Sequence, residues 1–267
     1  MKNKIVWLLI AASLILVAEV AVFTKRCNKA VNQSVNQPAA ENNLQISINS
    51  ISELDSFFNI KVEYPQFKDI DPVFNEKISA LITGEIEQFR KDSKDNWQAR
   101  KDTALPGEVV PENPPTPFDF IASWTPTQLN NKYLSFVINI YYFSGGAHGN
   151  EEVYTFNYDI AEKKEISIND FLGLSQQNLE KLAQLASQEV TSQLQSSGMQ
   201  TDSFLRQMIE QGTKPTQENF KDFNFSYNSL IIYFQKYQVA PGAAGSITIT
   251  LYKDTLESNS IKSDYLK

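Results

Sequence analysis

Hydrophobic and polar positions alternate with two different periods along residues 44–256. Apolar side chains at every second position predict strands, because successive side chains of a strand point to opposite faces. This pattern predicts strands near residues 46–48, 58–64, 118–124, 132–143, 153–160, 223–227, 230–237 and 246–252.

Apolar positions spaced three and four apart predict three helices between these strands. The first begins after Asp71 and Pro72, an N-cap residue followed by proline at the first helical position, and continues to about residue 101. The second begins after Ser175 and ends at Gly198, and a shorter third helix covers residues 204–212. This order of elements is not the regular alternation of a doubly wound sheet. It predicts an α+β fold with mostly antiparallel sheets and a few packed helices.

The first 43 residues differ from the rest of the chain. Residues 5–23 are apolar except for Glu19, and as a helix they would span about 28 Å at ~1.5 Å per residue, close to the roughly 30 Å core of a bilayer. We expect one transmembrane helix here, after a cytoplasmic stub at residues 1–4 and before a flexible spacer at residues 24–43. The chain is then a single-pass protein of the cell membrane with its bulk extracytoplasmic. A cleaved signal peptide is the alternative.

The remaining chain divides by pattern into two α+β subdomains, residues 44–148 and 149–256, with a tail at residues 257–267. A loop with five prolines, residues 106–117, is either a linker between domains or a long excursion within one. The net charge of −7 and the pI of 4.9 argue against nucleic acid as the main partner, because phosphate binding needs clustered Lys and Arg. One Cys and one His exclude an internal disulfide, a cysteine zinc cage and a His-pair metal motif, so no metal and no cofactor are expected.

Two small-residue loops carry the candidate site. In the segment YYFSGGAHGN, residues 141–150, Gly145 and Gly146 permit positive φ, and the single histidine, His148, lies beside them. His148 is either a general base or metal ligand, or a residue of a tight structural loop. The second loop, VAPGAAG at residues 239–245, is either a hairpin connection or a binding edge. The candidate binding residues are Tyr142, Gly145, Gly146, His148, Tyr237 and Pro241.

Aromatic residues recur along the strands and allow two interpretations. They either form a platform on which sugars stack, or pack in the core as cross-strand pairs, which is the commoner use of aromatics at period two. The residues concerned are Tyr141, Tyr154, Phe156, Tyr158, Tyr233 and Tyr237.

Three segments together resemble a known pair of domains: YYFSGGAHGN, the following FNYDIAEKKEISINDFL, and the closing YFQKYQVAPGAAGSITITL. They are similar to the adjoining domains of formerly unknown function in the extracytoplasmic part of RsiV-type lysozyme-binding anti-sigma factors and in the N-terminal part of PdaC-type peptidoglycan deacetylases. The resemblance covers about residues 45–256. Gly149 stands where the family has proline, and Gly242 where it has an aromatic residue.

The resemblance implies an exported α+β module of the bacterial cell envelope. Since neither a sigma-factor domain nor a deacetylase domain is recognised, we expect a non-catalytic, membrane-anchored module that binds a wall component, such as peptidoglycan, or a lysozyme-like protein. The alternatives are a structural envelope scaffold without a ligand and a hydrolase centred on His148.

Overall fold

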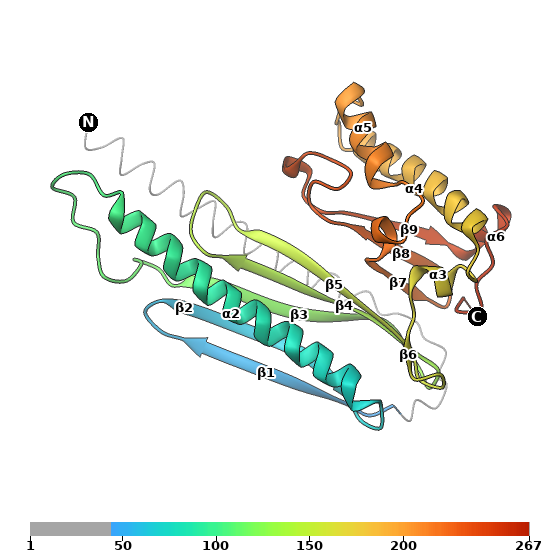
Figure 1. The fold of residues 1–267 in the computed structure, drawn as a ribbon, viewed down its shortest axis with the longest axis horizontal. Coiled ribbons are helices and arrows are strands. Elements are labelled where there is room, and N and C mark those ends of the chain that lie inside the picture. The colour runs from blue at the N-terminus through green and yellow to red at the C-terminus, as the bar shows by residue number, and fades with distance from the viewer. Residues whose placement is uncertain (1–43, 267) are drawn as a thin grey trace.

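The computed structural model describes residues 44–266, which form two packed units (Figure 1). The first unit, residues 44–165, is a six-stranded sheet with one long helix on its face, and the second, residues 166–266, is a three-stranded sheet with several helices. The expected stub, membrane anchor and spacer lie outside the described residues. Within residues 44–266, none of the helices combines the length and apolar composition that a membrane crossing requires.

The six strands of the first unit follow one another in chain order across the sheet. Neighbours are antiparallel except β2 and β3, which run parallel because helix α2 crosses between them. The elements are β1 (Ile46–Leu54), β2 (Phe58–Phe67), α2 (Pro72–Asp102), β3 (Phe118–Leu129), β4 (Tyr133–Phe143), β5 (Asn150–Asp159) and β6 (Lys164–Glu165).

Helix α2 begins where the sequence predicts. The side chain of Asp71 accepts a hydrogen bond from the backbone N–H of Val73 at 3.0 Å, and Pro72 occupies the first turn. Its buried positions form one stripe on the sheet and stop at Ser93, nine residues before the helix ends: Phe74, Ile78, Ile82, Ile86, Phe89 and Ser93. Beneath the helix, the rings of Phe136 and Phe156 stack with centroids 5.0 Å apart.

The second unit is built around an antiparallel sheet in the order β7-β8-β9. Helices α4 and α5 lie over this sheet (Figure 1). The elements are α3 (Ile168–Phe171), α4 (Gln176–Ser196), α5 (Ser203–Gly212), β7 (Phe223–Ser226), β8 (Ser229–Phe234), β9 (Ile247–Tyr252) and α6 (Lys253–Ser258), with short 3-10 turns at Glu218–Phe220 and Gly242–Ala244.

The two units join through buried polar side chains. Ser135 and Asn157 lie on the sheet face opposite α2, since Phe136 and Phe156 beside them face the helix. Ser135 Oγ accepts the backbone N–H of Phe225 at 2.9 Å, and Asn157 Nδ2 donates to the carbonyl of Phe223 at 2.7 Å. These two backbone groups belong to β7, an edge strand of its sheet, where they have no neighbouring strand to pair with in the described structure. Side chains of the first unit therefore satisfy the hydrogen-bonding groups of this edge.

The α+β class with mainly antiparallel sheets is confirmed, and the parallel β2–β3 pair is an exception that the sequence did not predict. The division between the units lies later than the expected 148/149 boundary, because β5 and β6 pair within the first sheet. Nor is the segment from residue 257 a separate tail: Ile261 and Leu266 are buried in the core of the second unit.

Candidate functional site

The glycine loop, residues 144–149, connects β4 to β5 and depends on its glycines in two ways. Gly145 and Gly146 have φ of +97° and +112°, which side chains with a Cβ rarely adopt. At Gly149 a Cβ would lie 2.4 Å from the ring of Tyr141, so that residue is needed for close approach. Asn96 of α2 holds the loop by donating from Nδ2 to the carbonyl of Ser144 at 2.9 Å.

His148 is exposed at the end of this loop. Its Nδ1 lies 2.9 Å from the carbonyl oxygen of Gly149, its one hydrogen-bond partner among residues 44–266. Within the described chain, no three His, Cys, Asp or Glu side chains gather closely enough to hold a metal ion. The geometry around His148 is therefore that of a surface residue of a structural loop.

A cleft of 520 Å³ lies along the edge of β5, between the two units. This stretch of β5 has no strand partner on its outer side in the described structure, because β6 pairs only with Tyr158 and Asp159. The cleft, as the term is used below, is lined by Tyr142, Asn150, Glu151, Glu152, Val153 and Tyr154 of the first unit and Lys221, Asp222, Gln235 and Lys236 of the second.

One wall of the cleft is a chain of phenols and carboxylates. Tyr142 Oη donates to Glu152 Oε1 at 3.0 Å, and Tyr154 Oη lies 2.6 Å from Glu152 Oε2 and 2.6 Å from Glu85 Oε1 of α2. Burial and the neighbouring Glu152 carboxylate raise the pKa of Tyr142 to about 12. Burial and the same carboxylates also raise the pKa of Tyr154 well above its ordinary value. Both phenols therefore stay protonated donors at neutral pH.

On the opposite wall, the side-chain amide of Gln235 bridges the two units. Gln235 Nε2 donates to the backbone carbonyl of Val153 at 2.9 Å and to Asp222 Oδ2 at 3.0 Å. Burial raises the pKa of the Asp222 carboxyl above its ordinary value. Lys236 adds an ammonium group 5.5 Å from the ring centroid of Tyr237. The cleft thus combines donors, acceptors and both charge signs, as binding sites for polar ligands commonly do.

A second pocket, the aromatic pocket, lies on the other side of the glycine loop and measures 560 Å³. Its walls are Trp97, Phe118 and Phe143, with ring centroids 6.3 Å apart for Trp97–Phe118 and 6.1 Å for Phe118–Phe143. The remaining lining residues are Asn96, Ala99, Arg100, Thr103, Pro114, Pro115, Thr116, Gly145 and Gly146. Trp97 Nε1 donates to the carbonyl of Glu112 at 2.9 Å, which holds the proline-rich loop over the pocket.

The second small-residue loop forms a separate surface. Tyr237 lies beyond the end of β8 with φ of +71°, so the strand expected to reach it is shorter than predicted. A Cβ on Gly242 would lie 2.3 Å from the Tyr237 ring, and Pro241 begins the 3-10 turn beside it. The six candidate residues are therefore divided between sites: Tyr142 lines the cleft, Gly145 and Gly146 line the aromatic pocket, Tyr237 and Pro241 meet at this loop, and His148 lines neither pocket.

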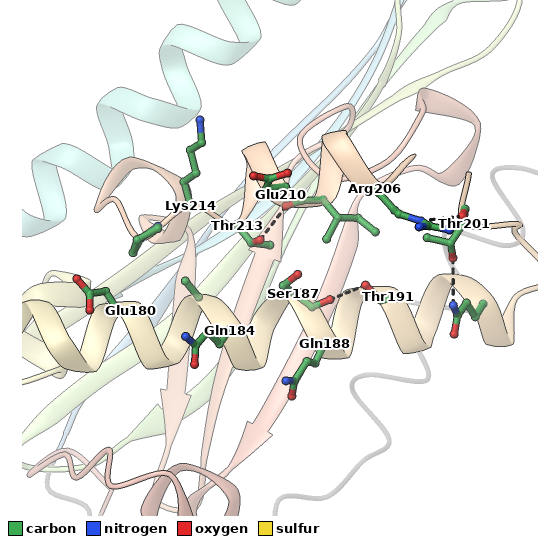
Figure 2. Close-up of a pocket in the computed structure, with 14 residues that line it drawn as sticks. Glu180, Gln184, Ser187, Gln188, Thr191, Thr201, Arg206, Glu210, Thr213 and Lys214 are labelled. Atoms are coloured by element: carbon green, nitrogen blue, oxygen red, sulfur yellow. Dashed lines mark hydrogen bonds between the residues drawn. The ribbon is translucent and has the colours of Figure 1, made fainter. Parts of the chain in front are cut away.

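A groove between α4 and α5, with a volume of 890 Å³, was not anticipated (Figure 2). Its hydroxyl groups are largely engaged within the protein: Thr191 Oγ1 donates to the carbonyl of Ser187 and Thr213 Oγ1 to that of Ile209, both at 2.7 Å. Since the groove contains none of the candidate binding residues that the sequence singled out, whereas the glycine loop contributes to the aromatic pocket and Tyr142 to the cleft, we place the candidate site at the cleft and the aromatic pocket. The one sequence feature that could have indicated this groove is a stripe of small and amide side chains on α4, next to the apolar stripe of the same helix.

Comparisons with known proteins agree with this two-part organisation. Residues 51–151 match the family model described as "Deacetylase PdaC", and residues 169–254 match "Protein of unknown function (DUF3298)". The chain is 29% identical over 213 residues to the peptidoglycan-N-acetylmuramic acid deacetylase PdaC of Bacillus subtilis. The match covers 78% of this chain and 40% of the relative, so the chain spans less than half the length of that protein.

Two solved structures share the fold. A DUF3298 family member from Bacteroides fragilis superposes with a TM-score of 0.55 at 16% identity, covering 82% of this chain and 94% of that one. A DUF3298 family protein from Pseudomonas aeruginosa gives a TM-score of 0.50 at 14% identity, covering 84% and 95%. The resemblance inferred from the sequence is thus confirmed: the chain pairs a region similar to the PdaC family with a region similar to the DUF3298 family.

Proposed function

We propose that this protein is a non-catalytic module of the bacterial cell envelope that binds a wall component in the cleft, with residues 5–23 as its membrane anchor. The observation that carries the proposal is the convergence of Tyr142, Glu152, Asp222 and Lys236 on one cleft between the two units. The relative from Bacillus subtilis is named for action on peptidoglycan, and this supports a wall polymer as the ligand.

The cleft groups match the chemistry of a wall glycan. A glycan offers many hydroxyl groups, each both donor and acceptor, together with amide groups. The phenol oxygens, whose protons are held by carboxylates, can accept from such a ligand, as can the Glu152 and Asp222 carboxylates, while the Lys236 ammonium group can donate to it. The exposed His148, bonded only to its neighbour's carbonyl among the described residues, supports binding rather than hydrolysis as the role of this region.

Sedimentation of the full chain, in detergent micelles, with purified peptidoglycan sacculi tests the proposal. The wild type is expected to pellet with the sacculi, and Glu152→Gln, which removes a charged acceptor while keeping the side-chain shape, is expected to pellet much less. Tyr227→Phe is the matched control, because Tyr227 is 38% exposed and lies outside the cleft. Failure of the wild type to pellet, or equal pelleting of Glu152→Gln and Tyr227→Phe, contradicts wall binding through the cleft.

A lysozyme-like protein is the second candidate ligand. The net charge of −7 and the carboxylates of Glu151, Glu152 and Asp222 in the cleft favour a basic partner. Binding to immobilised lysozyme is then expected to weaken steeply as salt rises, since exposed charges are screened within about 10 Å at 0.1 M. Salt-independent binding argues against the charge-based part of this candidate, and no binding to lysozyme or sacculi leaves the ligand-free scaffold.

A further inference from the structure

We propose that the aromatic pocket binds the acetamido group of an N-acetylated amino sugar. The inference rests on the proposed function, because it names the part of a wall glycan that the protein recognises. An acetamido group has an apolar methyl, a neutral N–H donor and a carbonyl acceptor. The pocket offers a counterpart to each of these three features.

The methyl group and the sugar ring fit the aromatic walls. Trp97, Phe118 and Phe143 present ring surfaces on three sides, and Pro114 and Pro115 add further apolar surface. The volume of 560 Å³ lies within the ~300–1,000 Å³ of small-ligand pockets. The C–H faces of sugar rings pack on aromatic rings for the same reason that apolar groups do, which makes Trp97 the main contact surface.

The amide atoms find partners at the glycine loop. Asn96 uses Nδ2 to hold the carbonyl of Ser144, and this leaves its Oδ1 as an acceptor for the acetamido N–H. Gly145 and Gly146 also line the pocket, and their backbone N–H groups donate to no other described residue. These N–H groups are therefore available to the acetamido carbonyl.

The charge of the pocket selects the acetylated form of the sugar. Among the described residues that line it, Arg100 is the one with an ionisable side chain, and its guanidinium group pairs with Glu108. Removal of the acetyl group would leave an ammonium group, which would lose its hydration against the rings, and none of the described lining side chains offers it a negative counter-charge. The pocket therefore favours a neutral acetamido group over a cationic amine.

Titration of the full chain, in detergent micelles, with three soluble trisaccharides tests the inference. Binding is followed by tryptophan fluorescence and calorimetry. The probes are the trimer of N-acetylglucosamine, the trimer of glucosamine and the trimer of glucose. Only the first is expected to bind, and Trp97→Leu is expected to weaken that binding by about tenfold or more, the loss of ~1.4 kcal/mol or more of contact energy. Trp124→Phe, which changes a tryptophan outside the pocket, is the control and is expected to bind normally.

A second variant separates charge selection from folding. Arg100 is exposed, so Arg100→Gln leaves the core intact, and it is expected to narrow the preference for the acetylated trimer over the glucosamine trimer. Equal binding of all three trimers, no binding of the acetylated trimer, or unchanged binding by Trp97→Leu overturns the inference. The acetylated trimer should also displace the chain from sacculi. If sacculi binding depends on Glu152 but the trimer neither binds nor competes, this inference fails while wall binding through the cleft stands.

Discussion

Replacement of Ser135 by alanine tests how the two units are held together. Ser135 is fully buried, and its Oγ accepts the Phe225 N–H at 2.9 Å and donates to Asn157 Oδ1 at 2.7 Å. The substitution removes one oxygen and creates almost no cavity, so its effect reports hydrogen bonding rather than packing. The Phe225 N–H points away from β8 toward the first sheet, so the variant leaves it without an acceptor.

The expected loss of stability follows from the groups left behind. A buried backbone donor without a partner costs about 1–3 kcal/mol, and the lost bond to Asn157 contributes about 0.5–1.5 kcal/mol. Asn157 Oδ1 keeps a contact from Asn224 Nδ2 at 3.1 Å, and this keeps the second effect near the lower end of its range. Thr127 Oγ1 and Asn224 Nδ2 also donate to Ser135 Oγ, but each keeps another acceptor, the carbonyls of Ser135 and Phe136, so their loss adds little. We therefore expect Ser135→Ala to lower the free energy of unfolding by about 2–3 kcal/mol.

Urea denaturation measures this loss with two probes. With Trp7 replaced by Phe in both proteins, Trp97 and Trp124 report the first unit by fluorescence, whereas far-ultraviolet circular dichroism reports both units. Because the lost bond to the Phe225 N–H joins the units, the variant's two unfolding curves are expected to separate while those of the wild type coincide. Ser52→Ala, at an exposed position of β1, is the control and should stay within about 0.5 kcal/mol of the wild type. A loss for Ser135→Ala as small as that of the control refutes the reasoning.

Three further predictions test particular positions. Burial raises the pKa of the Asp222 carboxyl, so its charged form lowers the stability of the folded state at neutral pH. Asp222→Asn should therefore raise the urea midpoint near pH 7 but not near pH 3, which lies below the ordinary pKa of ~3.9. A larger gain near pH 3 than near pH 7 contradicts the burial argument. Asp71→Ala removes the α2 cap and should cost about 1 kcal/mol in the same assay, with no loss if the cap is unimportant. Gly149→Ala forces a Cβ against the buried Tyr141 ring and should cost about 1–3 kcal/mol of stability. Gly84→Ala is the control: Gly84 lies within α2, a Cβ there would meet no other atom, and the change should stabilise the protein by up to about 1 kcal/mol. Equal effects of the two changes would show that contact with Tyr141 does not matter.

Local signals in the sequence predicted the elements well but not their partners. The Asp71–Pro72 pair and the apolar stripe fixed α2 to within a residue of its observed bounds, because caps and helical periodicity are local properties. The parallel pairing of β2 with β3 depends on where α2 returns the chain, and no local pattern records that. For the same reason the alternation in β5 looks alike whichever sheet it joins, so the boundary between the units was placed too early.

The candidate site was predicted in part. The glycine loop was visible because three glycines and the single histidine lie within five residues. The phenol–carboxylate wall was not, since Tyr154 and Glu85 are 69 residues apart and meet only through the packing of α2 on the sheet. Trp97 lies in the later half of α2 among many charged residues, and only the folding back of the proline-rich loop makes it a pocket wall.

Helix α2 continues for more than two turns beyond its last buried residue. Its buried stripe ends at Ser93, and the last nine residues, about 14 Å at ~1.5 Å per residue, carry Trp97, which packs on Phe118, and the exposed Arg100. Substitutions at exposed positions of this segment, such as Arg100, change what the pocket contacts without removing any side chain from the core. Ligand preference at the proposed acetamido site can therefore change through exposed positions at the end of α2 at little cost to folding, because the buried stripe that holds the helix on the sheet lies in the preceding turns.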